Sequence, residues 1–92
     1  MKIYRVSDPE MLKQFVPLMK DPAEAAKVQT RAVAWSSFAR KGNPDAMVIH
    51  LELSRSARLY VMKKGEKTVL GAVKLNAARD LAKGMEEIHE ST

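Results

Sequence analysis

Residues 46–75 decide the fold, and they read AMVIHLELSRSARLYVMKKGEKTVLGAVKL. Apolar side chains alternate with polar ones in the first part of this stretch, which is the period of a half-buried β-strand. Lys64-Gly65-Glu66-Lys67 is typical of a hairpin turn. We expect Val69, Val73 and Leu75 to share one face of the last strand. The stretch therefore predicts an antiparallel meander with strands at about 46–53, 58–63 and 68–75.

Two helix-start signals precede the meander. In Ser7-Asp8-Pro9-Glu10, either Ser7 is the cap and Glu10 closes a capping box, or Asp8 is the cap with Pro9 at the first helical position. Asp21-Pro22 combines a capping carboxylate with a proline at the first helical position, and Glu24 is placed as in a capping box. The first helix begins near residue 9 and should kink or break at Pro17, because proline lacks a backbone N–H. The second should run from 22 to about 40 and stop at Gly42. Its 3.6-residue period predicts a buried stripe made of Ala25, Val28, Ala32, Trp35 and Ala39.

The ends of the chain complete the pattern. Residues 1–6 are typical of a short strand, and Asn76 is a helix cap for a closing helix over about 77–90. The predicted order is β-α-α-β-β-β-α within one domain, residues 1–92. Apolar helix stripes need a sheet face to cover. We therefore predict an α+β fold with a mostly antiparallel four-stranded sheet and the helices packed on one face.

Composition narrows the function classes. The chain is 46% hydrophobic and 29% charged, which is typical of a globular domain. It has no cysteine, which excludes disulfides, thiolate metal sites and a cysteine nucleophile. The longest apolar runs have four residues, so we expect no membrane span. The first ten residues lack the apolar segment of a secretory signal, and we expect the cytoplasm of a bacterial host cell.

Charge gives the strongest functional indication. The net charge is +5, and the stretch from Lys27 to Lys74 holds ten basic residues against three acidic ones. A basic region on a small domain favours a polyanionic partner, because phosphate neutralisation releases counterions. The alternative is a mildly basic, solvated surface.

The basic residues group with aromatic ones in two places. Arg58, Tyr60 and Met62 share a strand face. If the helices cover the face that carries Ile49 and Leu51, the other face should present some combination of His50, Tyr60 and Lys74 to single-stranded bases and phosphates. The alternative is that Tyr60 and Met62 are core residues. On the second helix, Phe38 projects between two basic residues, unless it packs against the first helix instead. We predict that the residues binding nucleic acid or a partner are Lys27, Arg31, Arg55, Arg58, Lys63, Lys64 and Lys67.

Catalytic patterns are weak. His50 and Glu52 lie two apart on a strand and so share a face, near Ser54 and Ser56, but the spacing is not a triad signature. The C-terminal Glu and His residues lack the spacing of a helical metal face. We predict no catalytic, metal or cofactor-binding residue and no small-molecule substrate.

The whole chain, from KIYRVSDPEMLKQFVPLMKDPAEAAKVQTRAVAWSSFARKGNPDAM through the meander to the closing helix, resembles small phage anti-CRISPR proteins that act on the type I-F surveillance (Csy) complex. These proteins share no motif, so no residue role carries over. The resemblance implies a non-enzymatic inhibitor that binds Cas subunits, either alone or together with the guide RNA, and blocks hybridisation of target DNA. Some members are acidic DNA mimics, and this basic chain departs from that pattern.

Other functions remain open on the sequence. One is a free nucleic-acid-binding protein, such as a phage regulator or single-strand binder, which would bind naked RNA or DNA with a steep salt dependence. Another is a phage inhibitor of a different host machine.

Overall fold

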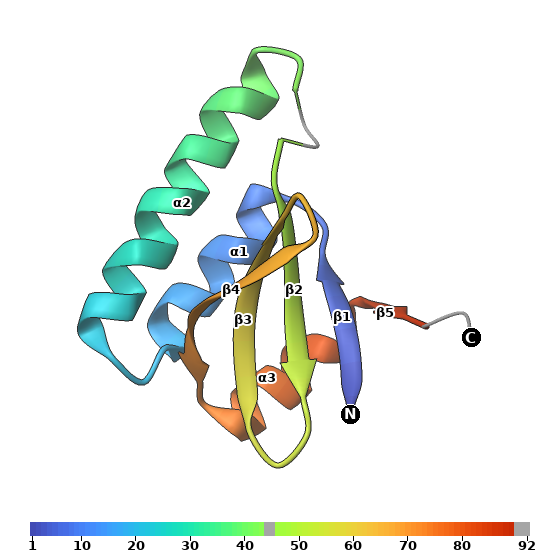
Figure 1. The fold of residues 1–92 in the computed structure, drawn as a ribbon. Coiled ribbons are helices and arrows are strands. Elements are labelled where there is room, and N and C mark those ends of the chain that lie inside the picture. Colours follow the sequence, from blue (N-terminus) through green and yellow to red (C-terminus); the bar gives the residue numbers. More distant parts are fainter. Residues whose placement is uncertain (44–45, 90–92) are drawn as a thin grey trace.

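The computed structural model describes residues 1–43 and 46–89. It has an α+β fold in which the three helices lie on the same side of an antiparallel sheet (Figure 1). In chain order the elements are β1 (Lys2–Val6), α1 (Pro9–Phe15), the 3₁₀ helix η1 (Val16–Leu18), α2 (Pro22–Arg40), β2 (Val48–Leu53), β3 (Ala57–Lys63), β4 (Glu66–Val73), α3 (Leu75–Ala82) and β5 (Glu86–Ile88).

The sheet has five strands in the order β4-β3-β2-β1-β5, not the four that the sequence predicted. The three-stranded meander is confirmed, and β1 pairs with β2 along its whole length. The closing helix was predicted to begin too late and to end too late. It begins at Leu75 with Lys74 as its N-cap, so Asn76 lies inside the helix and is not the cap. It ends at Ala82, and residues 86–88 pair with β1 instead. Gly84 disfavours helix continuation, and the free edge of β1 offers backbone hydrogen bonds to the segment that follows. The last predicted helical residue, 90, lies outside the described residues.

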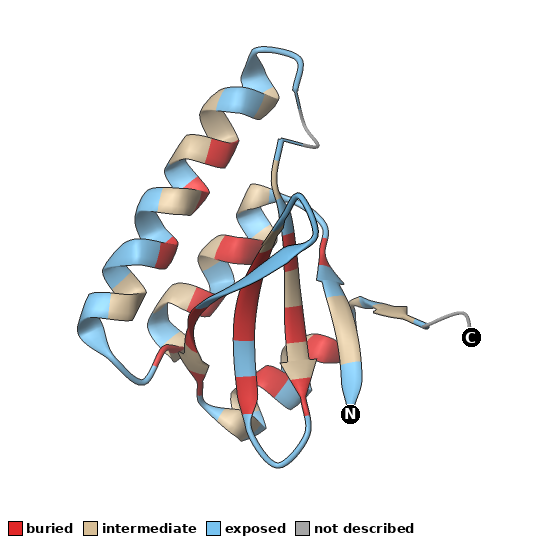
Figure 2. Ribbon diagram, in the orientation of Figure 1, coloured by how far each residue is buried: buried red, intermediate tan, exposed pale blue. Residues whose placement is uncertain are grey.

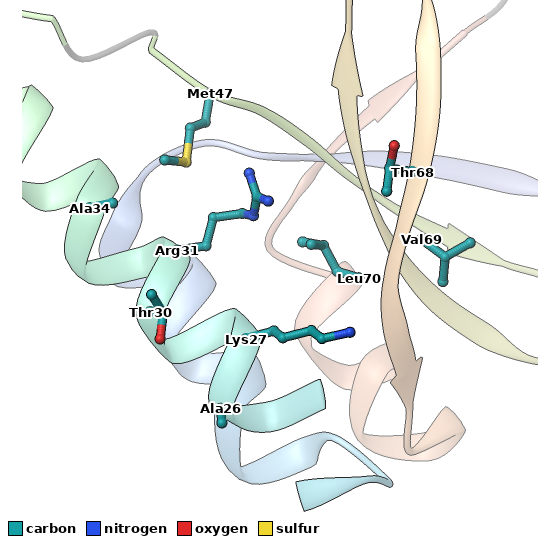
Figure 3. Close-up of a pocket in the computed structure, with 9 residues that line it drawn as sticks. All are labelled: Ala26, Lys27, Thr30, Arg31, Ala34, Met47, Thr68, Val69 and Leu70. Carbon is teal, nitrogen blue, oxygen red and sulfur yellow. The ribbon is translucent and has the colours of Figure 1, made fainter. Parts of the chain in front are cut away.

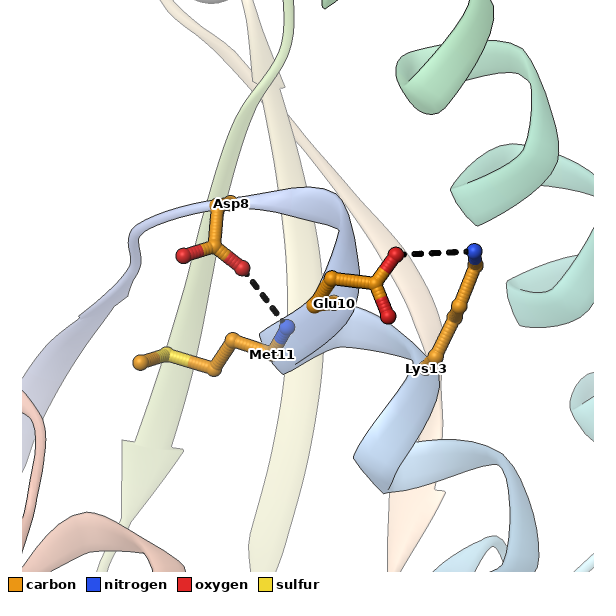
Figure 4. Close-up of polar contacts among 4 residues, drawn as sticks. All are labelled: Asp8, Glu10, Met11 and Lys13. Atoms are coloured by element: carbon orange, nitrogen blue, oxygen red, sulfur yellow. Dashed lines mark hydrogen bonds and ion pairs between the residues drawn. The ribbon is translucent and has the colours of Figure 1, made fainter.

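Both helix-start signals are confirmed. The Asp8 carboxylate accepts a hydrogen bond from the Met11 backbone N–H at 2.8 Å, and Glu10 forms an ion pair with Lys13 one turn later (Figure 4). The Asp21 carboxylate accepts from the Ala23 backbone N–H at 2.8 Å.

Three further helix predictions have a structural outcome. The first helix passes into η1 at residues 16–18, the break expected at Pro17. Glu24 does not close a capping box, because its carboxylate accepts from the Ala72 backbone N–H of β4 at 3.2 Å. Gly42 adopts φ 91° after the end of α2, which is the left-handed stop that only glycine adopts easily. Pro44 and Asp45 of the predicted turn lie outside the described residues.

The core lies between the sheet and the helices. The stripe of α2 is confirmed at Val28, Ala32 and Trp35, which are buried, with Trp35 only 2% exposed. They belong to the same hydrophobic core as the buried residues of α1 and of the strands, and the buried positions of α2 lie on its side toward the sheet (Figure 2). Ala25 and Ala39 are half-buried at the margins of this stripe.

The β3–β4 hairpin differs from the prediction in two ways. Its turn has two residues, Lys64 and Gly65, both with positive φ, so β4 begins at Glu66. The register then shifts opposite Leu59 and Tyr60. A bulge of this kind reverses which side chains face the core. Leu70 is therefore buried and Val69 is 51% exposed, against the expectation for Val69, and Leu75 belongs to α3.

Candidate nucleic-acid interface

One face of the sheet is not covered by the three described helices, which all lie on the other side (Figure 1). The strand registers place six polar or aromatic side chains together on this face. His50 is paired with Arg5 of β1 and with Tyr60 of β3, while Glu52 is paired with Arg58. We call these residues and Lys67 of β4 the open-face cluster, and its members are Arg5, His50, Glu52, Arg58, Tyr60 and Lys67.

Tyr60 is on the predicted face, but it is not an open platform for base stacking. Its side chain is only 8% exposed. The Lys67 ammonium lies 4.1 Å from the centre of the Tyr60 ring, and the same ammonium forms an ion pair with Glu52. A cation over an aromatic face is attracted to the ring quadrupole. The stacking hypothesis is therefore not supported by this geometry, whereas the clustering of charge on the open face is.

His50 lies at the centre of the cluster. Burial lowers the pKa of the His50 imidazole below its ordinary value of 6.5, and the positive charges of Arg5 and Lys67 act in the same direction. The Glu52 carboxylate opposes them. His50 is consequently neutral at pH 7, so one ring nitrogen can accept a proton or hydrogen bond.

The seven predicted binding residues do not form one patch. Arg58 and Lys67 belong to the open face, whereas Lys63 and Lys64 lie at the exposed tip of the β3–β4 hairpin. Arg55 lies in the loop between β2 and β3, which is at the opposite end of β3 from the hairpin tip.

The two predicted binding residues of α2 belong to a different place. Lys27 and Arg31 line a groove between α2 and β4. Phe38, the aromatic residue expected between them, is 42% exposed. Lys74 is the N-cap of α3 and does not belong to the open-face cluster. Linear proximity in the basic stretch did not translate into proximity in the fold.

Sequence reasoning missed Arg5 as a member of the cluster. The residue is 45 positions from His50 along the chain, but the two are direct cross-strand partners. The sequence carried a usable signal, because Arg5 is a charged residue between the β-prone residues Tyr4 and Val6. What it lacked was the pairing of β1 with β2.

A second basic hollow of about 320 Å³ was also missed. It lies between α3 and the ends of β1 and β2, and its cations come from the flanks of the chain. They are Lys2, Arg79 and Lys83, and Tyr4 and Ser54 also line the hollow. The flanks together carry a net charge of −2, so the net charge of each segment concealed this local excess of positive charge.

The structure also bears on metal binding and on membrane-spanning helices. Within residues 1–43 and 46–89, no group of three or more His, Asp or Glu side chains is arranged to hold a metal ion. Over the same residues, each helix is too short or too polar to cross a bilayer.

Comparison with known proteins gives no relative from which a role could be transferred. The chain matches no protein-family model, no curated protein and no solved structure.

Proposed function

We propose that the protein binds RNA phosphates through the open-face cluster and acts as a non-enzymatic inhibitor of an RNA-containing assembly. One observation carries the proposal. Strand pairing brings Arg5, Arg58 and Lys67 onto the same uncovered sheet face, around a neutral histidine. Glu52 belongs to this cluster and Glu86 of β5 is paired with Arg5 beside it, so the three cations exceed the two neighbouring carboxylates by one charge.

The geometry favours phosphates over bases as the groups that are bound. Arginine guanidinium groups bind phosphate oxygens in a bidentate manner, and such contacts set the affinity of most nucleic-acid-binding proteins. The covered ring of Tyr60 leaves little aromatic surface for stacking. We therefore expect binding with a strong salt dependence and little preference for base sequence.

The proposed assembly is the type I-F Csy complex of a bacterial host cell. The support is the resemblance of the chain to anti-CRISPR proteins, together with a charge that suits contact with guide RNA rather than mimicry of DNA. On this proposal, the inhibitor contacts Cas proteins and guide RNA and prevents target DNA from hybridising.

The test measures binding to a labelled single-stranded RNA by fluorescence anisotropy at several salt concentrations. The double variant Arg5→Gln/Arg58→Gln should bind about tenfold more weakly, and the slope of log K against log salt should fall by about 1.4, because two phosphate contacts are lost. The matched control is Lys13→Gln/Lys20→Gln, which removes the same charge away from the open face. Equal losses in both variants would contradict a defined site.

A comparison of affinity for the assembled complex and for naked RNA then separates an assembly inhibitor from a free single-strand binder. An inhibitor of the assembly binds the purified Csy complex more tightly than naked RNA and competes with target DNA. A free single-strand binder shows the reverse order. If the wild-type protein binds neither the complex nor the RNA, the proposed function is wrong.

A second candidate function, RNA cleavage, is favoured by the placement of His50 itself. A neutral imidazole can accept the proton of a ribose 2′-hydroxyl while that oxygen attacks the adjacent phosphorus, the 5′-oxygen leaving with a proton from water. Arg5 and Arg58 would stabilise the charge that develops on the phosphate. His50→Gln then removes cleavage by about a hundredfold or more but leaves RNA affinity nearly unchanged. Intact RNA after long incubation with the wild-type protein, or with its assembled target, excludes this function.

A further inference from the structure

A groove of about 630 Å³ runs between α2 and β4 (Figure 3). Ala34, Met47 and Leu70 give it apolar walls, and Lys27 and Arg31 extend from α2 into the space beside β4. None of the described residues that line the groove is acidic. The groove is therefore an apolar channel with a positive wall. It shares no lining residue with the open-face cluster, which it adjoins where Val69 is paired with Tyr60.

The sheet edge beside the groove already binds backbone at its other end. β4 is an outermost strand. Near its C-terminus, Val73 forms an isolated bridge with Met19, and the Lys20 N–H donates to the Ala72 carbonyl at 3.1 Å. The Glu24 carboxylate accepts from the Ala72 N–H. The chain thus uses its own residues 18–20 as a short extra strand on this edge, and this extra strand stops before the part of β4 that lines the groove.

We propose that the groove binds an extended, acidic segment of a partner protein, which adds as a further strand along residues 68–70 of β4. In an extended segment alternate side chains point to opposite faces. Carboxylates on the face toward α2 would pair with Lys27 and Arg31. Side chains on the other face would cover Val69, which is 51% exposed.

The chemistry of the groove favours an acidic segment over two other occupants, a nucleic acid and a second copy of this chain. Its walls are aliphatic and none of the described lining residues is aromatic, so bases have no stacking surface there and phosphates would lose hydration against apolar groups. A second copy of this chain carries a net charge of +5 and brings like charge to a positive wall. An acidic polypeptide satisfies both the charge and the apolar surface.

The inference goes beyond the proposed function and does not depend on it. RNA binding is assigned to the open face, and the partner segment is assigned to the α2–β4 groove. The variants used for one site leave the residues of the other unchanged.

The test uses isotope-labelled protein and the synthetic peptide Glu-Val-Glu-Ile-Glu-Val-Glu, followed by nuclear magnetic resonance. We expect amide shifts at residues 68–70 and along residues 27–34, with a Kd of about 10–100 μM. Lys27→Glu/Arg31→Glu should raise the Kd more than about tenfold. The control Arg55→Glu/Lys83→Glu makes the same charge change elsewhere and should alter the Kd by less than about twofold. The amide spectra of both variants report whether the fold is intact.

Strand addition is tested with two N-methylated peptides. Each peptide is methylated on alternate backbone nitrogens, in one register or the other, so that only one of them loses the N–H groups directed at β4. We expect one register to abolish binding and the other to preserve it.

Four results overturn the proposal. The first is equal binding by both methylated peptides, and the second is an unchanged Kd for Lys27→Glu/Arg31→Glu. The third is no binding of the parent peptide up to about 1 mM. The fourth is that single-stranded RNA displaces the peptide and itself shifts the amide signals of the groove. The last result would assign the groove to nucleic acid.

Discussion

His50 shows how a single residue on a sheet face acquires its chemical state from its neighbours. Burial lowers the pKa of its imidazole below 6.5, and Arg5 and Lys67 add to the effect. The folded chain therefore holds the His50 proton less tightly than the unfolded chain does. We expect the free energy of unfolding to be greatest above pH 6.5 and to decrease as the pH falls through the unfolded value toward the lower folded one.

Urea unfolding at a series of pH values between about 8 and 5 measures this dependence. His50→Gln should flatten the decrease, because glutamine does not titrate. The control is His89→Gln, which changes the exposed histidine near the C-terminus and should keep the slope of the wild type. A slope that survives in His50→Gln would show that other groups cause it.

At the scale of the element, a cap contributes more than an exposed ion pair. The Asp8 carboxylate satisfies one of the free backbone donors at the start of α1. Asp8→Ala should therefore lower the free energy of unfolding by about 1 kcal/mol. The ion pair between Glu10 and Lys13 lies on the same helix, but the Glu10 side chain is 77% exposed. Glu10→Gln should cost less than about 0.5 kcal/mol, because solvent screens the pair.

The two variants are compared by thermal and urea unfolding in low salt. Because Asp8 and Glu10 are both acidic and both near the N-terminus of α1, they have similar interactions with the helix dipole. The difference between them therefore isolates the hydrogen bond of the cap. Equal destabilisation by both variants would attribute the effect to charge alone.

The periodicity of α2 and β2 could be recognised in the sequence because it depends on residues close together in the chain. The cap and proline at the start of α2 and the alternation in β2 are local features, and both elements were found where predicted. The bulge at Leu70 could not be predicted from the sequence, because it is caused by the pairing of β4 with β3. One extra residue in the strand was sufficient to move Val69 from the predicted core to the surface.

At the scale of the whole molecule, the close packing of α2 against β4 depends on Gly71. A Cβ at Gly71 would lie 2.7 Å from the Glu24 Oε1 and 2.8 Å from the Glu24 Cβ. The Glu24 Cβ is fixed to α2, so the helix would have to move away from β4. We expect Gly71→Ala to lower the free energy of unfolding by about 1–3 kcal/mol, from overpacking at this contact.

Chemical denaturation of Gly71→Ala measures the loss, and Gly84→Ala is its control. At Gly84 the nearest atom to an added Cβ is 3.9 Å away. That substitution should be neutral or stabilise the protein by up to about 1 kcal/mol, because alanine restricts the unfolded chain. If Gly71→Ala is as stable as the wild type, α2 and β4 are not closely packed at this point.

The candidate sites show a similar division between local and distant information. The sequence identified a basic protein and placed Arg58, Tyr60, His50 and Glu52 on strand faces. It could not show that Arg5 joins them, nor that Lys67 covers Tyr60. Both depend on strand pairing and on the curvature of the β3–β4 hairpin. The groove between α2 and β4 likewise exists only because two distant elements diverge.

By itself, the sequence determined the class of the fold, the positions of α2 and the meander, and the burial of Trp35. Helix caps, turn residues and hydrophobic periods act over a few residues, so their effects can be predicted from the sequence. Only the tertiary structure decided the fifth strand, the inverted faces at the start of β4, and the separation of the basic residues into the open-face cluster, the hairpin tip and the α2–β4 groove. These features depend on backbone edges competing for hydrogen-bond partners and on side chains that meet only after distant segments pack together.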